Sequence, residues 1–95
     1  MQELERITGR NNPDLASLLY ILAVIYREQG RFEVSIHILR EMLEIRVTVF
    51  GLKHLVVAST LNNLSVLYWK RGDFETAKTF CQRALEIRQE VRDKL

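Results

Sequence analysis

An internal repeat constrains the fold of this chain more than any other feature of its sequence. The four glycines stand at residues 9, 30, 51 and 72, evenly spaced by 21 residues, which is half of a 42-residue period. When residues 13–50 are aligned with residues 55–92, 14 positions are identical. A repeat of about 40 residues with helical patterning is typical of helix pairs that stack on one another. We therefore expect an all-α fold of antiparallel helices.

The positions that recur form an apolar framework at helical spacing. The clearest matches across 42 residues are Ala16/Ala58, Leu19/Leu61, Leu22/Leu64, Val24/Val66, Tyr26/Tyr68, Gly30/Gly72 and Phe32/Phe74. The run Leu43–Arg46 also recurs whole at Leu85–Arg88. The stretch from Leu61 to Phe74 indicates a helix, a tight turn at Gly72 and the start of a second helix.

Glycine tolerates the left-handed backbone conformation that ends many helices, so the spaced glycines predict helix ends. We expect about five helices, over residues 2–8, 13–29, 32–50, 54–71 and from 73 onward. Asn12 and Asp73 suit the N-cap positions of two of them. The last helix has no stop signal, because Asp93 stands 42 residues after Gly51.

The 3–4 residue spacing of apolar side chains predicts which of them face the core. In the second and third helices these are Leu15, Leu18, Leu19, Leu22, Ile25, Tyr26, Ile36, Leu39, Leu43 and Val47. In the last helix they are Phe74, Ala77, Phe80, Cys81, Ala84, Leu85 and Val91. We also expect Phe50 and Val57 in the core, and Cys81 to be a buried, inert thiol.

The composition excludes several classes of function. Ninety-five residues make one small domain, here residues 1–95, with 47% hydrophobic and 27% charged residues. The net charge of +2 is spread along the chain, whereas nucleic acid or an anionic membrane favours a concentrated basic stripe. No apolar run approaches the roughly 20 residues that span a bilayer, and the N-terminus does not resemble a signal peptide. If the chain is natural, we expect a cytoplasmic location.

The sequence offers little material for catalysis. His37 and His54 lie on separate predicted elements, and neither has a partner at metal-ligand spacing. The glycines fall singly at helix ends, so there is no phosphate-binding loop. We expect surface histidines, no enzyme activity, no metal, no cofactor and no small-molecule substrate.

The stretch Leu61–Gly72, with Ala77 and Ala84, resembles a tetratricopeptide repeat. The 42-residue period and the strings LNNLxVLYxKRGxF and ALEIR are similar to the kinesin light chain type of this repeat. The resemblance implies a right-handed α-solenoid fragment of about two and a half repeats. Residues 2–9 would be a half repeat, and residues 13–50 and 55–92 the two full ones.

In that family the first helix of each pair lines a concave groove. The resemblance places six residues there: Tyr20, Val24, Arg27, Asn62, Val66 and Trp69. Each set follows i, i+4, i+7 spacing and so shares one helix face. An Asn amide can hydrogen-bond a peptide backbone, and aromatic side chains often dominate interfaces. The alternative is that these residues only cover a shallow core.

The loop between the repeats departs from the family. Apolar residues stand where the kinesin light chain type usually has charged, small or proline residues: Val47, Leu52, Leu55 and Val56. An exposed apolar patch marks an interface, so these residues predict self-association as a homodimer, or binding of a protein partner. The alternative is a different helix packing that buries them within the chain.

The family framework with new apolar surface residues favours an engineered sequence over a diverged natural one. Our leading functional prediction is a non-enzymatic helical-repeat scaffold whose encoded property is its fold and possible self-association. The alternative is a natural adaptor fragment that binds a cargo peptide in the concave groove, as kinesin light chains do.

Overall fold

The computed structural model describes residues 13–95, which form four α-helices and no strand. These are α2 (Pro13–Glu28), α3 (Phe32–Phe50), α4 (Leu55–Arg71) and α5 (Phe74–Asp93). The prediction of an all-α fold is confirmed for residues 13–95, and the ends of these four helices fall within a residue or two of those expected. The helix predicted over residues 2–8, and Asn12 as a cap, lie outside the described residues.

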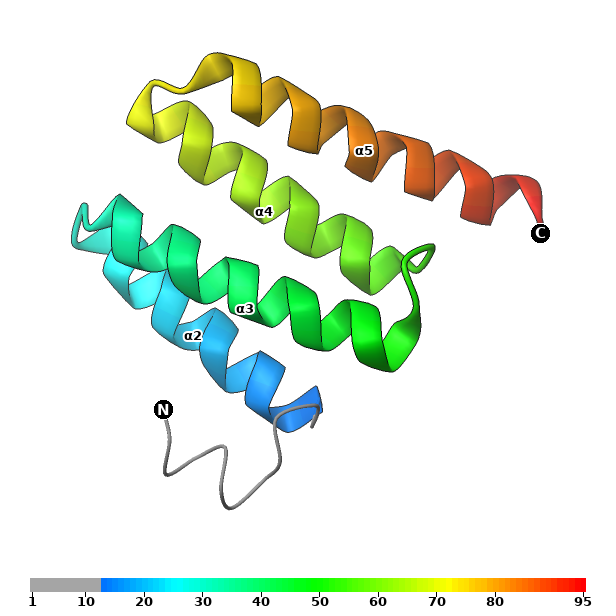
Figure 1. The fold of residues 1–95 in the computed structure, drawn as a ribbon, viewed down its shortest axis with the longest axis horizontal. Helices are drawn as coiled ribbons and strands as arrows, with labels where there is room; N and C mark the ends of the chain where they lie inside the picture. Colours follow the sequence, from blue (N-terminus) through cyan, green and yellow to red (C-terminus); the bar gives the residue numbers. More distant parts are fainter. Residues whose placement is uncertain (1–12) are drawn as a thin grey trace.

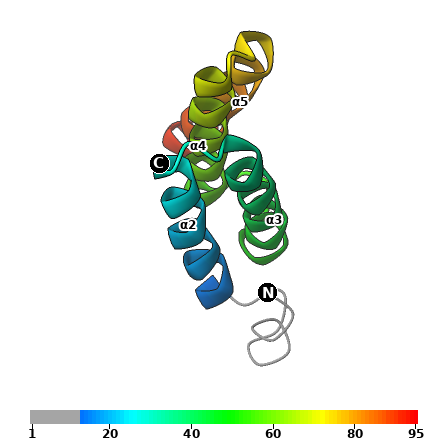
Figure 2. The same cartoon turned by 90° about the vertical axis from the view of Figure 1, so that its left-hand side faces the viewer.

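The helices form two antiparallel hairpins, α2–α3 and α4–α5 (Figure 1). Helix α4 packs on α5 within its own hairpin and on α3 of the first hairpin, and this second contact joins the two. Figure 2 shows the same helices after a quarter turn, with α5 at the top, α4 in the middle, and α2 and α3 side by side below. Among the described helices, α3 and α4 therefore have neighbours on two sides, whereas α2 and α5 have them on one.

Both hairpins turn at a glycine with positive φ, as the spacing predicted. Gly30 has φ 77° and Gly72 has φ 94°. The N–H of Asp73 donates to the carbonyl of Tyr68 at 2.9 Å, and that of Arg31 donates to the carbonyl of Tyr26 at 2.9 Å. These bonds satisfy carbonyls that the helix ends leave free. The two hairpins therefore turn with the same glycine conformation and the same backbone hydrogen bond.

The two hairpins differ in how their helices begin. Asp73 caps α5 as predicted, because its side chain accepts a hydrogen bond from the Thr76 N–H at 3.3 Å. Hydrogen bonding from Thr76, first from its side chain and then from its backbone N–H, lowers the pKa of the Asp73 carboxyl. His54, which was expected to be the first residue of its helix, is instead its cap: Nδ1 accepts from the Val56 N–H at 3.0 Å.

The core consists of two adjoining clusters of apolar side chains. The first fills the space between α2, α3 and α4, with Ala77 of α5 at its edge. The second lies between α4 and α5 and contains Val57, Ala58, Leu61, Ala84 and Ile87. Val57 is therefore in the core, as predicted. Leu43 and Phe80 pack against both clusters, so the core is continuous across the two hairpins.

Several side chains that were predicted to face inward are exposed. These corrections are Leu18, Ile25, Phe50, Phe74, Cys81 and Leu85. Helical spacing identifies an apolar face, but burial needs a neighbouring element on that face. No described helix covers the outer faces of α2 and α5. Phe50 instead lies beside the His54 ring, with centroids 4.8 Å apart.

Candidate functional site

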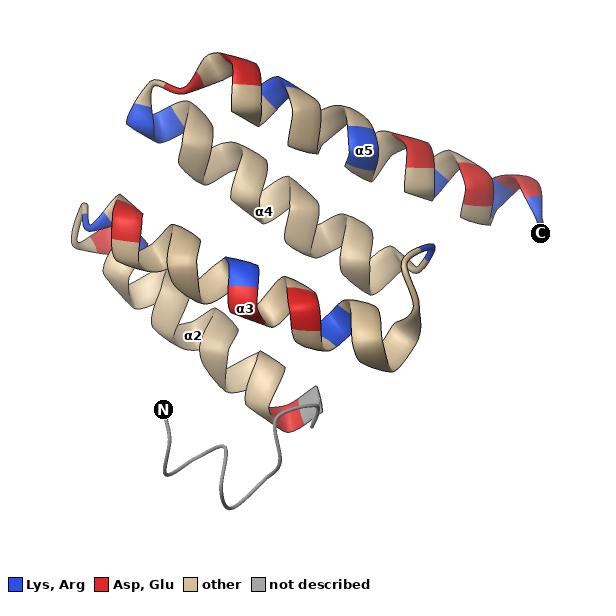
Figure 3. Ribbon diagram, in the orientation of Figure 1, with Lys and Arg blue, Asp and Glu red and all other residues tan. Residues whose placement is uncertain are grey.

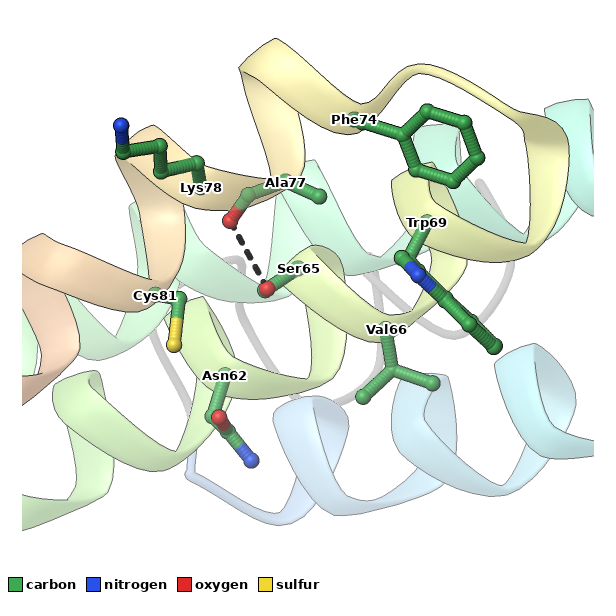
Figure 4. A pocket seen from close by; sticks show the side chains of 8 residues that line it. All are labelled: Asn62, Ser65, Val66, Trp69, Phe74, Ala77, Lys78 and Cys81. Carbon is green, nitrogen blue, oxygen red and sulfur yellow. Dashed lines mark hydrogen bonds between the residues drawn. The ribbon is translucent and has the colours of Figure 1, made fainter.

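A cleft of about 370 Å³ opens between α4 and α5 (Figure 4). Its lining residues are Asn62, Ser65, Val66, Trp69, Phe74, Ala77, Lys78 and Cys81. We call it the α4–α5 cleft. The α4 residues recur at three- and four-residue steps, as do those of α5, so each set lies on one face of its helix. The cleft is therefore built by two helix faces of one hairpin.

Small residues form the floor of this cleft. The Ser65 hydroxyl donates to the Ala77 carbonyl at 2.8 Å, which ties α4 to α5 where the two helices lie close together (Figure 4). Large aromatic residues stand at its rim, where 61% of Trp69 and 62% of Phe74 are exposed. Small residues beneath and aromatic residues above leave a hollow that can accept side chains from another segment.

The α4–α5 cleft is almost free of charge, since Lys78 is the one ionised side chain in its lining. Figure 3 shows that charged residues gather on α3 and α5, while most of α4 carries none. Arg71, at the end of α4, is paired with Glu33 of α3, and the hydrogen bond to that carboxylate raises the pKa of Arg71. The cleft thus suits an apolar group better than a charged one.

The structure divides the six predicted groove residues between two clefts. Asn62, Val66 and Trp69 line the α4–α5 cleft. The other three, Tyr20, Val24 and Arg27, line a much smaller cleft of about 10 Å³ between α2, α3 and α4. We call this the α2–α3 cleft.

Sequence reasoning missed the α5 side of the larger cleft. Phe74, Lys78 and Cys81 line it, although Phe74 and Cys81 had been assigned to the core. A usable signal was present, because Phe74 belongs to the repeated Phe32/Phe74 pair, directly after the predicted turn at Gly72.

The four apolar residues around the loop have different surroundings. Val47 packs against the second core cluster and is half-buried, and Val56 is also half-buried. Leu52 and Leu55 are exposed. Leu52 lines a hollow of about 130 Å³ whose other walls are mostly charged. Intramolecular burial therefore accounts for part of this set, and self-association through the exposed pair stays a prediction.

Neither a metal site nor a membrane span is found among residues 13–95. No group of three or more His, Cys, Asp or Glu side chains there could hold a metal ion. None of the described helices is long and apolar enough to cross a membrane. His37 is exposed, with Nε2 3.9 Å from the Glu41 carboxylate.

Comparison with protein families explains this architecture. The sequence model of the tetratricopeptide repeat matches residues 14–90, which is most of the chain and both of its hairpins. The chain belongs to the tetratricopeptide repeat family. Comparison with curated proteins finds no match.

Membership of this family indicates the general role of the site. Tetratricopeptide repeats generally mediate protein–protein contacts and are not enzymes. This tetratricopeptide repeat chain is accordingly a helical-repeat scaffold for protein interaction, and the α4–α5 cleft is its candidate contact surface.

Proposed function

We propose that this chain is a non-enzymatic scaffold that binds an apolar helical segment of a protein in the α4–α5 cleft. The observation that carries the proposal is the pairing of an apolar cleft with two largely exposed aromatic residues, Trp69 and Phe74. Aromatic side chains that border a pocket are common anchors of protein interfaces.

A protein segment fits this cleft better than a small polar ligand. Only Lys78 could pair with a charged ligand, and the rest of the lining offers mainly apolar contact. Burying a large apolar side chain fully stabilises a complex by about 1.5–3 kcal/mol, so covering two largely exposed rings contributes a useful part of a micromolar affinity. A helix supplies such cover because its apolar side chains recur on one face.

We also infer that the scaffold is of an engineered type. The regular 42-residue framework and the exposed apolar residues Leu52 and Leu55 support this inference. The alternative, an adaptor that holds a cargo peptide in a concave groove as in kinesin light chains, has less support. Its first three residues, Tyr20, Val24 and Arg27, line a cleft with about 10 Å³ of free space.

A differential peptide selection tests the proposal. A displayed library of helical peptides is selected against the parent, Val66→Glu and Val49→Glu. The two valines are matched, with 37% and 39% of their surfaces exposed, but Val49 is not among the residues that line the cleft. We expect peptides with apolar residues at i and i+4 to be enriched on the parent and on Val49→Glu only.

Affinities of the selected peptides give the magnitude. Trp69 is the one tryptophan in the chain, so its emission reports on the cleft directly. We expect binding to shift this emission to shorter wavelength, and Val66→Glu to weaken binding at least about tenfold. Equal enrichment on all three proteins would contradict the proposal.

A further inference from the structure

The two clefts are the same feature of the repeat, seen twice. Six residues of the α2–α3 cleft have their 42-residue counterparts in the α4–α5 cleft. The pairs are Tyr20/Asn62, Ala23/Ser65, Val24/Val66, Arg27/Trp69, Ser35/Ala77 and Leu39/Cys81. Each hairpin therefore builds one cleft from the same positions.

The α2–α3 cleft is filled by side chains of α4. Asn63 and Leu67 of α4 complete the lining of the α2–α3 cleft, and its free volume is about 10 Å³. Leu67 is fully buried there. No helix among the described residues covers the α4–α5 cleft, and its free volume is about 370 Å³. The chain itself thus shows what fills this kind of cleft, namely the first helix of the hairpin that follows.

Helix α2 carries an apolar face at the positions that correspond to the face of α4 in contact with the first hairpin. Three α4 residues that meet the first hairpin are Thr60, Asn63 and Leu67, and their counterparts 42 residues earlier are Leu18, Ile21 and Ile25. These three counterparts are apolar and lie on one face of α2, with 42%, 54% and 46% of their surfaces exposed. Helix α2 therefore has the composition of an inner helix at an outer position.

We propose that α2 of a second copy of this chain docks in the α4–α5 cleft, repeating between copies the packing of α4 on the first hairpin. The inference rests on the proposed function and deepens it, because it names the protein segment that the cleft binds. Ile21 and Ile25 of the second copy take the places that Asn63 and Leu67 hold within one chain.

Two polar contacts of the internal interface keep hydrogen-bonding groups on both sides when they are carried over between copies. Arg40 of α3 donates to the Tyr68 hydroxyl at 2.9 Å, and the corresponding pair between copies is Gln82 with Tyr26. An amide N–H can make the same bond to a phenol oxygen. The Glu33–Arg71 ion pair becomes Glu75 with Gln29.

A third polar contact of the internal interface is not kept between copies. The hydrogen bond from Arg46 to Thr60, at 2.9 Å, has Arg88 and Leu18 in the corresponding places. None of these three corresponding pairs brings like charges together.

This interface is head-to-tail. The α2 face of one copy engages the cleft of the next, which leaves one free α2 and one free cleft at the ends of every assembly. Such a heterologous contact extends unless its rotation closes a ring. We therefore expect assemblies that grow beyond a dimer as concentration rises, and a longer continuous stack of repeats in each of them.

A complementation experiment tests the proposal through mass in solution. Ile21→Glu destroys the docking face and keeps the cleft, whereas Val66→Glu does the reverse. Sedimentation and light scattering are measured for the parent, each variant and their equimolar mixture. We expect a parent mass that rises with concentration, two monomeric variants, and a 1:1 dimer in the mixture that does not grow further.

Control variants separate this surface from others. Val49→Glu and Leu55→Glu place the same charge at exposed apolar residues outside both the α2 face and the cleft, and should associate as the parent does. Circular dichroism checks that each variant is folded. If Ile21→Glu or Val66→Glu is not, Ile25→Glu or Trp69→Glu replaces it.

Three results would overturn the proposal: a parent that is monomeric at all concentrations, a mixture that stays monomeric, or association lost in Leu55→Glu and kept in Ile21→Glu. The peptides selected above are then tested on Ile21→Glu, whose cleft is intact. If they bind, only the second copy is the wrong occupant and the proposed function stands. If they do not bind, the proposed function fails as well.

Discussion

The two hairpins share a 42-residue pattern, yet identical residues in them are buried to different extents. Leu64 is fully buried and Tyr68 nearly so, whereas their counterparts Leu22 and Tyr26 are half-buried. The cause is position in the stack, because α4 packs closely on both α3 and α5, while α2 packs closely on α3 alone. The same residue type can therefore be core in one repeat and rim in the other.

The close contact between the two helices of each hairpin behaves in the opposite way. The same type of hydrogen bond is present in both hairpins, although the residues that form it differ. In the first hairpin the Ser35 hydroxyl on α3 donates to the Ala23 carbonyl on α2, at 2.7 Å. In the second, Ser65 on α4 donates to the Ala77 carbonyl on α5, at 2.8 Å. Serine and alanine have changed helices, and the hydrogen bond has been preserved with its direction reversed.

The largest effect we expect comes from truncating the framework leucines. Leu64→Ala should lower the free energy of unfolding by about 2–5 kcal/mol, since it removes a fully buried side chain and leaves a cavity. Leu22→Ala should cost clearly less, because Leu22 is half-buried. Urea unfolding followed by circular dichroism measures both. Equal losses would show that α2 is covered as fully as α4 in solution.

The turns should respond alike, because the hairpins share them. Gly72→Ala and Gly30→Ala should each cost about 1–2 kcal/mol, the penalty of a left-handed backbone for a residue with a Cβ atom. Nothing lies within 4 Å of the added Cβ at either site, so the cost comes from the backbone alone. Thermal and urea unfolding check this. A loss confined to one variant would mean that the two turns are not equivalent.

The exchanged hydrogen bonds should differ slightly in their contribution. Ser35→Ala should cost about 1 kcal/mol, the usual net contribution of a buried hydrogen bond. Ser65→Ala should cost less, because Ser65 borders the open α4–α5 cleft and is 9% exposed, whereas Ser35 is 1% exposed. The comparison needs paired urea titrations of the two variants. The reverse order would indicate that the α4–α5 cleft is covered in solution, as a docked second copy would do.

The smallest effect should appear at low pH and distinguish the two helix starts. The pKa of Asp73 is lowered in the folded chain, mainly by its hydrogen bond from Thr76, from an ordinary value of 3.8. Its stabilising contribution is therefore complete above that value and is lost as pH falls through the lowered pKa. Arg31, at the corresponding position before α3, makes no side-chain cap.

The measurement is the unfolding midpoint from pH 2 to 7, for the parent and for Asp73→Asn. Asparagine also caps helices and does not titrate in this range, so it removes only the pH dependence. We expect the parent to lose more stability than Asp73→Asn as the pH falls below about 4. Identical pH profiles for the two proteins would rule out this role of Asp73.

Local features were predicted well because they depend on neighbours in the chain. The glycine turns and the Asp73 cap follow from backbone geometry within a few residues, and the structure confirms them. Three of the eight residues that line the α4–α5 cleft were among the predicted groove residues, since Asn62, Val66 and Trp69 lie on one face of a single helix. The α5 wall was missed, because helical spacing marks a face as apolar without saying whether another helix covers it.

The sequence by itself determined the repeat, the helices, their turns and the apolar face of each helix, since all of these are set by short-range sterics and periodicity. The tertiary structure alone decided which copy of each face is buried. Leu39 is core and Cys81, its counterpart, is exposed, because α4 covers the first cleft and no described helix covers the second. Burial is a property of the stack of helices, and only the arrangement in space shows which helix faces have a neighbour.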